Sequence, residues 1–455
     1  MRLFADTTPL RSPDFRRLWV AGIPTVIGAN LTIFAVPVQI YALTGSSAYV
    51  GLAGLFALVP LVVFGLLGGA WADAMDRRTL LIIASCGLAV ASVLLWVQAI
   101  LGAGVWVVLC LLAVQQAFYA INAPTRSAAI PRMVAAGDLP AANSLNMTVA
   151  QFGAIVGPLL AGLLLNWVDL PTLYLIDALT CLIPVWATWR LSPMPPVGAA
   201  VRRCSRESAP GPAKARGSRD RRMNPVGESR FGFAAVLDGF RYLATNTVVL
   251  MSFVVDLIAM VLGMPRALFP QIAAVDFGGP VEGGTTMALL AAAMSAGAVA
   301  GGVFSGWLPR VDRQGLAIVV AIVVWGAAMA GFGLAVGRAG GHPGAVLWVA
   351  LAFLAVGGAA DMVSAAFRST MLQQAASDEV RGRLQGVFIV VVAGGPRLAD
   401  TVHGAAGALL GTSVAAAGGG VLVVVGVLLA ALAVPAFLGY RRSGGIPRPP
   451  YPGDR

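Results

Sequence analysis

Two long apolar stretches of the chain are joined by the segment Gly68-Gly69-Ala70-Trp71-Ala72-Asp73-Ala74-Met75-Asp76-Arg77-Arg78. A small residue such as Gly69 allows neighbouring helices to approach closely in a membrane. Asp73 follows four residues later, where a carboxylate can bind basic residues or the positive N-terminal end of another helix. The pattern predicts a charged turn between two spanning helices, and its plainer interpretation is a tight turn with arginines on the cytoplasmic side.

Lipid is the solvent that the composition indicates. Hydrophobic residues make up 58% of the 455 residues and charged residues only 11%, and the mean hydropathy is +0.83. Soluble domains carry roughly 25% charged residues. The net charge of +11 lies in short stretches between apolar runs, so we interpret it as a signal of membrane topology and expect no binding of nucleic acid.

Twelve stretches have the length and composition of spanning helices, which need roughly 20 mainly apolar residues. The sequence therefore predicts an all-α membrane protein. The predicted spans lie near 18–42, 48–72, 79–100, 104–122, 141–165, 171–190, 246–270, 285–308, 315–336, 345–366, 384–410 and 415–438.

The predicted spans fall into two groups of six. Residues 1–190 hold the first group and residues 242–440 hold the second. Residues 191–241 between them are basic and poor in apolar side chains, which predicts a disordered cytoplasmic linker. Contact of this linker with anionic lipid headgroups is the alternative. Residues 441–455 are expected to form a cytoplasmic tail.

The positive charges predict the orientation of the chain. With the N-terminus in the cytoplasm, 28 of the 31 Lys and Arg residues fall on the cytoplasmic side, as the positive-inside rule requires. In this arrangement Arg266 and Arg338 lie near the outer face and Arg397 lies within the eleventh span. We expect a multi-pass protein of the plasma membrane, the bacterial inner membrane, with both termini cytoplasmic.

The two groups of spans repeat one another. Duplicated transporters of this kind bind substrate at the interface of the repeats, near the middle of the membrane. An offset of 242 positions aligns Arg126 with Arg368, Gly153 with Gly395, and Gly162 with Gly404.

The chain resembles the major facilitator superfamily. The signature of that family between spans two and three is a Gly, an Asp four residues later and a basic cluster, matched here by Gly69, Asp73, Asp76, Arg77 and Arg78. The resemblance implies a major facilitator fold of twelve transmembrane helices in two pseudo-symmetric six-helix halves. It also implies that these five residues form a latch that holds the halves in the outward-facing state.

The fifth span carries a second match, made of Gly153, Gly157, Pro158 and Gly162. Glycines four apart make a smooth face for tight packing, and a proline removes a backbone donor and permits a bend. The pattern resembles the antiporter motif that marks exporters in the superfamily. Ordinary close packing is the alternative.

Four further segments narrow the resemblance to one branch of the family. They are 12–19, 35–41, 43–46 and 381–386, and they resemble the enterobactin-exporter and macrolide-efflux branch of the drug:proton antiporters. That branch implies export of a small amphipathic molecule (a siderophore, a macrolide or a similar natural product or drug) by proton antiport with alternating access. The expected partners are then a small-molecule substrate, protons and the lipid bilayer. We expect a monomer and no cofactor.

Charged side chains within the spans are the candidates for proton coupling, because an ionisable group at the bilayer centre costs roughly 2.5–3.5 kcal/mol. Span eleven carries Arg397, Asp400 and His403 at intervals of three, which places neighbours on nearby faces of a helix. We expect a relay through Asp400 and His403 with Arg397 as counter-charge, or else a structural ion pair and a hydrogen-bonded histidine. The preceding residues 394–396, Gly-Gly-Pro, predict a bend or break in the helix.

Asp256 is the strongest single candidate for the proton carrier. No charged residue lies within nine positions of it in the seventh span, and burial without a partner favours the protonated form of a carboxyl group. A structural bond to another helix is the alternative. The fourth span, 104–122, lacks the arginine that many drug/proton antiporters carry there. The candidates for substrate binding are Asn30, Gln39, Gln115, Gln116, Asp177 and Asp361.

The sequence lacks motifs that are typical of other functional classes. The chain has two histidines, no HExxH sequence and no GxxxxGK[ST] sequence, and its only lysine is Lys214. We therefore expect neither an enzyme nor a metal site. An importer or uniporter, the membrane subunit of an ATP-driven pump and a non-transporting receptor remain as alternatives to the exporter.

Overall fold

Long helices make up almost all of the structure, a computed structural model that describes residues 6–194, 247–375 and 378–441. The first half contains α1 (Pro13–Thr44), α2 (Ser47–Ala74), α3 (Arg77–Leu101), α4 (Val105–Ala129), α5 (Leu139–Leu164) and α6 (Leu170–Trp189). The second half contains α9 (Thr247–Gly263), α10 (Phe269–Gln271), α11 (Thr285–Val303), α12 (Gln314–Val336), α13 (Ala345–Ala375), α14 (Asp378–Leu410), α15 (Thr412–Ala433) and α16 (Pro435–Leu438).

The predicted all-α membrane fold is confirmed. Within the described ranges, eleven helical segments are long and apolar enough to cross a membrane. The 33-residue helix α14 is a further long helix, of which only part has described side chains. Most of the predicted linker 191–241 and of the predicted tail 441–455 lies outside the described residues.

The outer surface of the helix bundle is apolar, as lipid contact requires. Large apolar side chains are exposed on it, among them Leu101, Trp167, Phe304, Leu409 and Leu432. Lipid tails are as apolar as these side chains, so packing between the helices depends on close approach and on hydrogen bonds.

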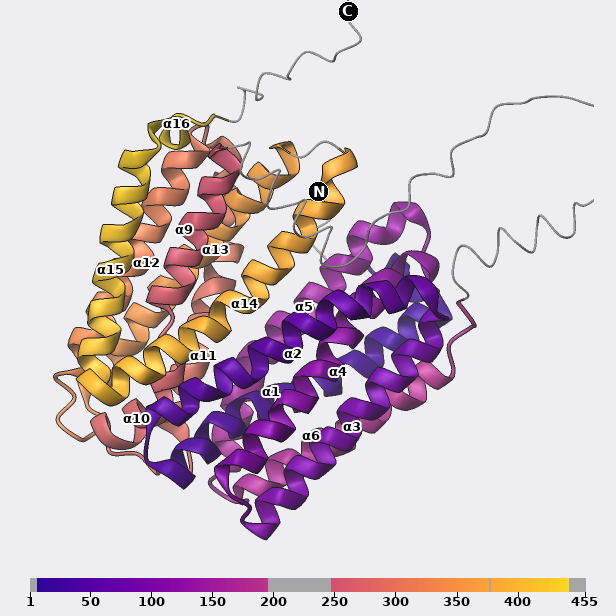
Figure 1. The fold of residues 1–455 in the computed structure, drawn as a ribbon, viewed down its shortest axis with the longest axis horizontal. Coiled ribbons are helices and arrows are strands. Elements are labelled where there is room, and N and C mark those ends of the chain that lie inside the picture. Colours follow the sequence, from indigo (N-terminus) through magenta and orange to yellow (C-terminus); the bar gives the residue numbers. More distant parts are fainter. Residues whose placement is uncertain (1–5, 195–246, 376–377, 442–455) are drawn as a thin grey trace, which may run out of the picture.

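The two halves diverge toward the end of the molecule drawn at the top of Figure 1 and approach each other at the other end. We call the latter the distal end, which carries the connections α1–α2, α5–α6 and α14–α15. The opposite end, the terminal end, carries the start of α1 and the α2–α3 connection. Between the halves, α2 packs along α14 and α5 packs along α11.

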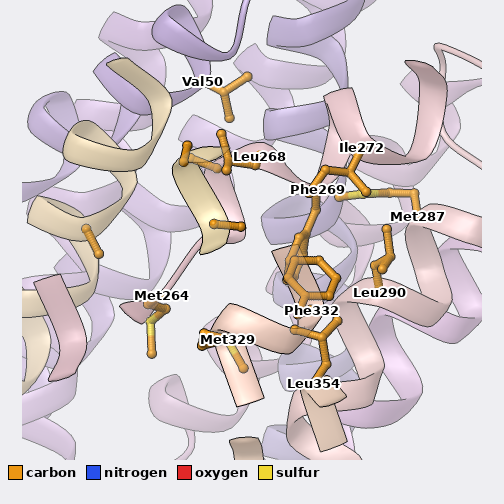
Figure 2. Packing of buried hydrophobic residues seen from close by; sticks show 14 of the residues in the cluster. Val50, Met264, Leu268, Phe269, Ile272, Met287, Leu290, Met329, Phe332 and Leu354 are labelled. Atoms are coloured by element: carbon orange, nitrogen blue, oxygen red, sulfur yellow. The ribbon is translucent and has the colours of Figure 1, made fainter. Parts of the chain in front are cut away.

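The seventh span is interrupted near its middle, a feature that the predicted span 246–270 does not include. Helix α9 ends at Gly263, and a short 3-10 helix (Arg266–Leu268), α10 and a π-helix (Ile272–Asp276) continue toward the distal end. Figure 2 shows Leu268, Phe269 and Ile272 of this segment within the apolar core. The ring of Phe269 lies edge-on to that of Phe332 of α12, with centroids 6.1 Å apart. The interrupted segment therefore fills the space between the halves.

Three other boundaries differ from the predicted ones. Helix α4 continues to Ala129 and includes Arg126, and α13 continues to Ala375 and includes the buried Arg368. Helix α14 continues through Pro396, so of the bend or break predicted there the break is wrong. Prolines are tolerated within membrane helices because neighbouring groups can satisfy the freed backbone carbonyl.

Candidate functional site

A cavity of about 310 Å³ lies between the two halves. Residues of α1, α2, α4 and α5 line it from the first half, and residues of the interrupted seventh span, α11 and α14 line it from the second. Its apolar walls include Phe34, Leu112, Phe269 and Met294. Its polar lining consists of Asn30, Thr32, Gln115, Gln116, Arg266, Ser295, Arg397 and Asp400. The cavity therefore combines apolar walls with a few converging polar groups, as small-molecule sites do.

Two arginines share one carboxylate in this cavity. Arg266 Nη2 lies 3.6 Å from Asp400 Oδ2, and Arg397 Nη1 lies 4.0 Å from the same oxygen. Both distances exceed the roughly 2.7–2.9 Å of a charge-assisted hydrogen bond. Asp400 thus lies between the two guanidinium groups without binding either one tightly.

The neutral polar residues of the cavity come from α1 and α4. Asn30 donates to the Val26 carbonyl at 2.8 Å, which leaves the second amide hydrogen and the amide oxygen of its side chain for other partners. Gln115 donates to Ser92 Oγ at 3.4 Å, and Gln116 is almost fully buried. The structure thus brings Asn30, Gln115 and Gln116 of the predicted substrate-binding set to the same place as Arg397 and Asp400.

The glycines of the fifth span, α5, pack against two different helices. A Cβ added at Gly153 or Gly157 would collide with Val26 or Asn30 of α1. A Cβ added at Gly162 would collide with Ala288 of α11 and would lie 2.9 Å from the Gly284 carbonyl oxygen. Pro158 lines the cavity. One face of α5 therefore packs within its own half, and its distal turn packs against the second half.

Glycines also form the contact between α2 and α14 at the distal end. A Cβ added at Gly404 would lie 2.5 Å from the Gly51 Cα. Ser47 Oγ donates to the Gly404 carbonyl at 3.1 Å, and Thr401 Oγ1 donates to the Gly51 carbonyl at 3.1 Å. The backbones of α2 and α14 therefore approach each other closely at the distal end, and two side-chain hydroxyl groups bond across the contact.

The predicted latch lies at the terminal end. Gly69 and Asp73 belong to α2, but their side-chain surroundings lie outside the described residues. Asp76 caps α3, since its Oδ1 accepts from the Thr79 amide at 3.2 Å. Its Oδ2 accepts from the Met194 amide at 2.9 Å. Asp76 thus joins the start of α3 to the segment that follows α6.

The two latch arginines also bond within the first half. Arg77 Nη1 donates to the Ala128 carbonyl at 2.8 Å, and Arg78 Nη2 donates to the Trp189 carbonyl at 2.6 Å. These carbonyls lie at the ends of α4 and α6. These two hydrogen bonds therefore join the start of α3 to the terminal ends of α4 and α6 within one half.

Asp256 lies outside the cavity and forms an ion pair. Its carboxylate contacts the guanidinium group of Arg368 on α13, and both side chains are buried. Arg368 Nη2 also lies 3.8 Å from Asp361 Oδ1, and its Nε donates to the Ser364 carbonyl at 3.4 Å. The expectation that Asp256 is buried without a partner is therefore wrong, because the bond to another helix that was its alternative is present.

Asp177 belongs to a hydrogen-bond network inside the first half. Its Oδ2 accepts from Thr32 Oγ1 at 2.7 Å and from Ser92 Oγ at 2.8 Å. It is almost fully buried and does not line the cavity. The network joins α6 to α1 and α3.

Gln39 makes a second network in the same half. Gln39 and Gln98 exchange side-chain hydrogen bonds of 3.2 and 2.9 Å, and the Tyr174 hydroxyl donates to Gln39 Oε1 at 2.8 Å. Like Asp177, Gln39 is outside the cavity lining.

His403 is buried on the side of α14 that faces α15. Its Nδ1 lies 3.1 Å from the Ala399 carbonyl oxygen, and a Cβ added at Gly419 of α15 would lie 2.9 Å from its Nε2. His403 therefore contacts α15 and is not part of the described cavity lining, whereas Asp400, its partner in the predicted relay, lines the cavity.

Two charged residues of these sites are missing from the predicted set. Arg266 is predicted near the outer face, but the interrupted seventh span carries it into the cavity. Arg368 is predicted in a loop, but it is buried within α13. The proline that precedes Arg266 could have indicated the interruption.

Similarity to known proteins is consistent with this geometry. The family model of the Major Facilitator Superfamily matches residues 18–399. The enterobactin exporter EntS of Salmonella typhi is 26% identical over 430 residues, which cover 92% of this chain and 91% of that protein.

Solved transporters share the fold. The nucleoside transporter NupG superimposes with a TM-score of 0.66 at 14% identity, covering 94% of this chain and 98% of that one. A bacterial homologue of the iron transporter ferroportin gives 0.62 in its inward-facing state, at 13% identity and 94% and 98% coverage. Its outward-facing state gives 0.55, at 14% identity and 94% and 99% coverage. The two-half fold and the family match together show that the chain belongs to the Major Facilitator Superfamily and is a multi-pass membrane transporter, not an enzyme.

Proposed function

We propose that this transporter exports a small amphipathic molecule, such as a siderophore, a macrolide or a similar natural product, across the bacterial inner membrane. The observation that carries the proposal is the cavity between the halves, which has apolar walls and a small set of polar and charged groups. The likeness to an enterobactin exporter supports the outward direction. The cavity forms within one chain, which supports a monomer as the working unit.

The structure corresponds to the inward-facing state in this proposal. Cytoplasmic termini, favoured by the distribution of arginines, would make the distal end the outer face. The glycine contacts at the distal end would then close the cavity toward the outside. The higher TM-score with the inward-facing than with the outward-facing ferroportin homologue supports the same assignment.

Alternating access then requires the distal contacts to separate while the terminal end closes. Asp76, Arg77 and Arg78 bond within the first half here. In the outward-facing state we expect this loop, with Gly69 and Asp73, to latch onto the second half. The antiporter-motif glycines Gly153, Gly157 and Gly162 would keep α5 packed against α1 and α11 during the change.

We propose that Asp256 and its partner Arg368 couple transport to protons. Protonation of Asp256 would remove the negative charge that balances a buried arginine, and Arg368 would then have Asp361, at 3.8 Å, as its remaining carboxylate. Removing one charge of a buried ion pair leaves the other charge uncompensated, which is destabilising. Protonation of Asp256 would therefore favour a different packing of α9 against α13. A route through Asp400 and His403, with Arg397 as counter-charge, is the alternative.

The test measures proton release from the purified protein in detergent as a catecholate siderophore, a macrolide and an aromatic acid are added. Release in the wild type that is lost in Asp256→Asn supports antiport through Asp256. The matched control is Asp169→Asn, an exposed carboxylate at the start of α6 that makes no capping hydrogen bond. Release that persists in Asp256→Asn moves the assignment to Asp400 and His403.

Transport itself is tested in vesicles without ATP. Flux driven by an imposed proton gradient and abolished by an uncoupler supports the exporter. A requirement for ATP would assign the chain to an ATP-driven pump, and binding without any flux would indicate a receptor.

A further inference from the structure

We infer that the cavity selects cargo carrying one anionic group, which binds Arg266 and Arg397 in competition with Asp400. This inference rests on the proposed export function. It narrows the cargo to compact acidic molecules.

The charge of the cavity is the first argument. Among the residues that the structure describes, its lining contains three ionisable side chains, two arginines and one aspartate. One positive charge is therefore unbalanced among the lining residues. A charge at membrane depth is costly unless a partner or water compensates it, so an anionic ligand would be favoured over a neutral ligand of the same shape.

The geometry of the three groups is the second argument. Asp400 Oδ2 lies 3.6 Å from Arg266 and 4.0 Å from Arg397, which leaves both guanidinium groups without a short bond to it. Arg266 Nε is buried and has no hydrogen-bond partner among the described residues. An arginine offers five N–H donors in a planar fork that fits a carboxylate, sulfonate or phosphate. The site thus has donors ready for a second anionic group.

The remaining lining restricts the rest of the cargo. Phe34, Phe269 and Met294 provide apolar surface, and Gln115 and Gln116 provide neutral hydrogen-bonding groups. A volume of about 310 Å³ is near the lower end, roughly 300 Å³, of known ligand pockets. These features fit a compact aromatic acid.

The experiment compares two dyes that differ by one charge. Anilinonaphthalene sulfonate and its neutral parent, phenylnaphthylamine, share the same aromatic rings. Their dissociation constants are measured by equilibrium dialysis against the protein in phosphatidylcholine nanodiscs, with empty discs as the blank. The wild type is expected to bind the sulfonate at least about tenfold more tightly, because hydrogen bonds to charged groups are the stronger ones.

The arginine variants and the aspartate variant are expected to change the affinity for the sulfonate in opposite directions. Arg266→Gln and Arg397→Gln should each weaken sulfonate binding about tenfold and leave the neutral dye unchanged. Asp400→Asn should tighten sulfonate binding several-fold, because it removes the competing carboxylate. Arg338→Gln, an exposed arginine outside the cavity, should change neither. A misfolded variant exposes apolar surface and binds more of both dyes, so an increase in Asp400→Asn that is confined to the sulfonate cannot come from misfolding.

Several results would overturn the inference. Equal binding of the two dyes by the wild type is one, and unchanged sulfonate binding in both arginine variants is another. Loss of sulfonate binding in discs that contain phosphatidylglycerol would assign the arginines to a lipid phosphate instead. Proton-driven flux of the neutral dye without preference for the sulfonate would keep the exporter and remove the charge selectivity. Selective sulfonate binding without flux would keep the charge selectivity of the cavity and remove the exporter function.

Discussion

Asp256 of α9 and Arg368 of α13 form an ion pair that is buried in the second half of the transporter. The counterpart of Arg368 in the first half is Arg126, which donates to the carbonyl of Leu18 at 3.3 Å. The repeat thus keeps the arginine. Among the described interactions, Arg368 pairs with a carboxylate on another helix, whereas Arg126 donates to a backbone carbonyl. A proton that binds Asp256 would alter one half and not the other.

A double-mutant cycle tests the coupling of this pair. Arg368→Gln should destabilise the protein by about 3–5 kcal/mol, because it leaves a buried carboxylate unpaired. Asp256→Asn should cost less, since Asp361 remains near Arg368. The double variant should be more stable than the sum of the two losses implies. The measurement is thermal unfolding in one detergent, and strictly additive losses would contradict the coupling.

The contact of Gly404 with Gly51 predicts a conformational effect. Gly404→Ala places a methyl group 2.5 Å from the Gly51 Cα, so the distal ends of α2 and α14 must separate. We expect a cysteine introduced at Met294, in the cavity, to react faster with an impermeant thiol reagent added from the distal side. The four native cysteines are first replaced. The control is Gly418→Ala, whose methyl group meets no atom within 4 Å; equal rates in both variants would refute the prediction.

The contact of Gly157 with Asn30 predicts a rescue. Gly157→Ala creates a clash with the Asn30 Cβ, and overpacking of this kind costs about 1–3 kcal/mol. Adding Asn30→Gly removes the clashing atom and should recover part of the loss, less about 1 kcal/mol for a glycine within a helix. Thermal unfolding is again the readout, with Gly65→Ala as the unobstructed control. A double variant less stable than Gly157→Ala would show that the clash is not the cause.

We predict a structural role for Asp177, although its network reaches the cavity lining at Thr32 and, through Ser92, at Gln115. Asp177→Leu leaves the hydroxyl groups of Thr32 and Ser92 without their acceptor, and each unsatisfied buried group costs about 1–3 kcal/mol. We expect a lower unfolding temperature and an unchanged dissociation constant for cargo, measured well below that temperature. A large change in cargo affinity would instead show that Asp177 positions the cavity side chains of Thr32 and Gln115 for binding.

The spans could be predicted from the sequence because the bilayer imposes a length and a composition on each of them. What could not be predicted is which proline interrupts its helix. Pro265 and Pro396 both follow glycine-containing apolar runs, yet the helix ends before Pro265 and continues through Pro396. The difference lies in the surroundings: residues after Pro265 fill the space between the halves, whereas α14 around Pro396 packs along α2.

The same limit applies to the site. Gln115, Asn30 and Asp400 could be selected because polar residues are rare in these spans, but Gln39 and Asp177 satisfy the same criterion and bond within their half. Only the rotation of each helix decides between cavity and network, and composition does not determine rotation. Arg368 is not among the predicted site residues for another reason. Its helix extends nine residues beyond the predicted end at 366.

The distal contact between α2 and α14 is made by glycine backbone and by the hydroxyl groups of Ser47 and Thr401, whereas the cavity beside it is lined by other side chains. Opening and cargo choice therefore depend on different atoms of the same two helices. Related transporters could diverge in what they carry by exchanging a handful of cavity positions while their mechanical cycle stays intact. Resistance to a new toxic compound would then be within reach of a few point mutations in such a chain.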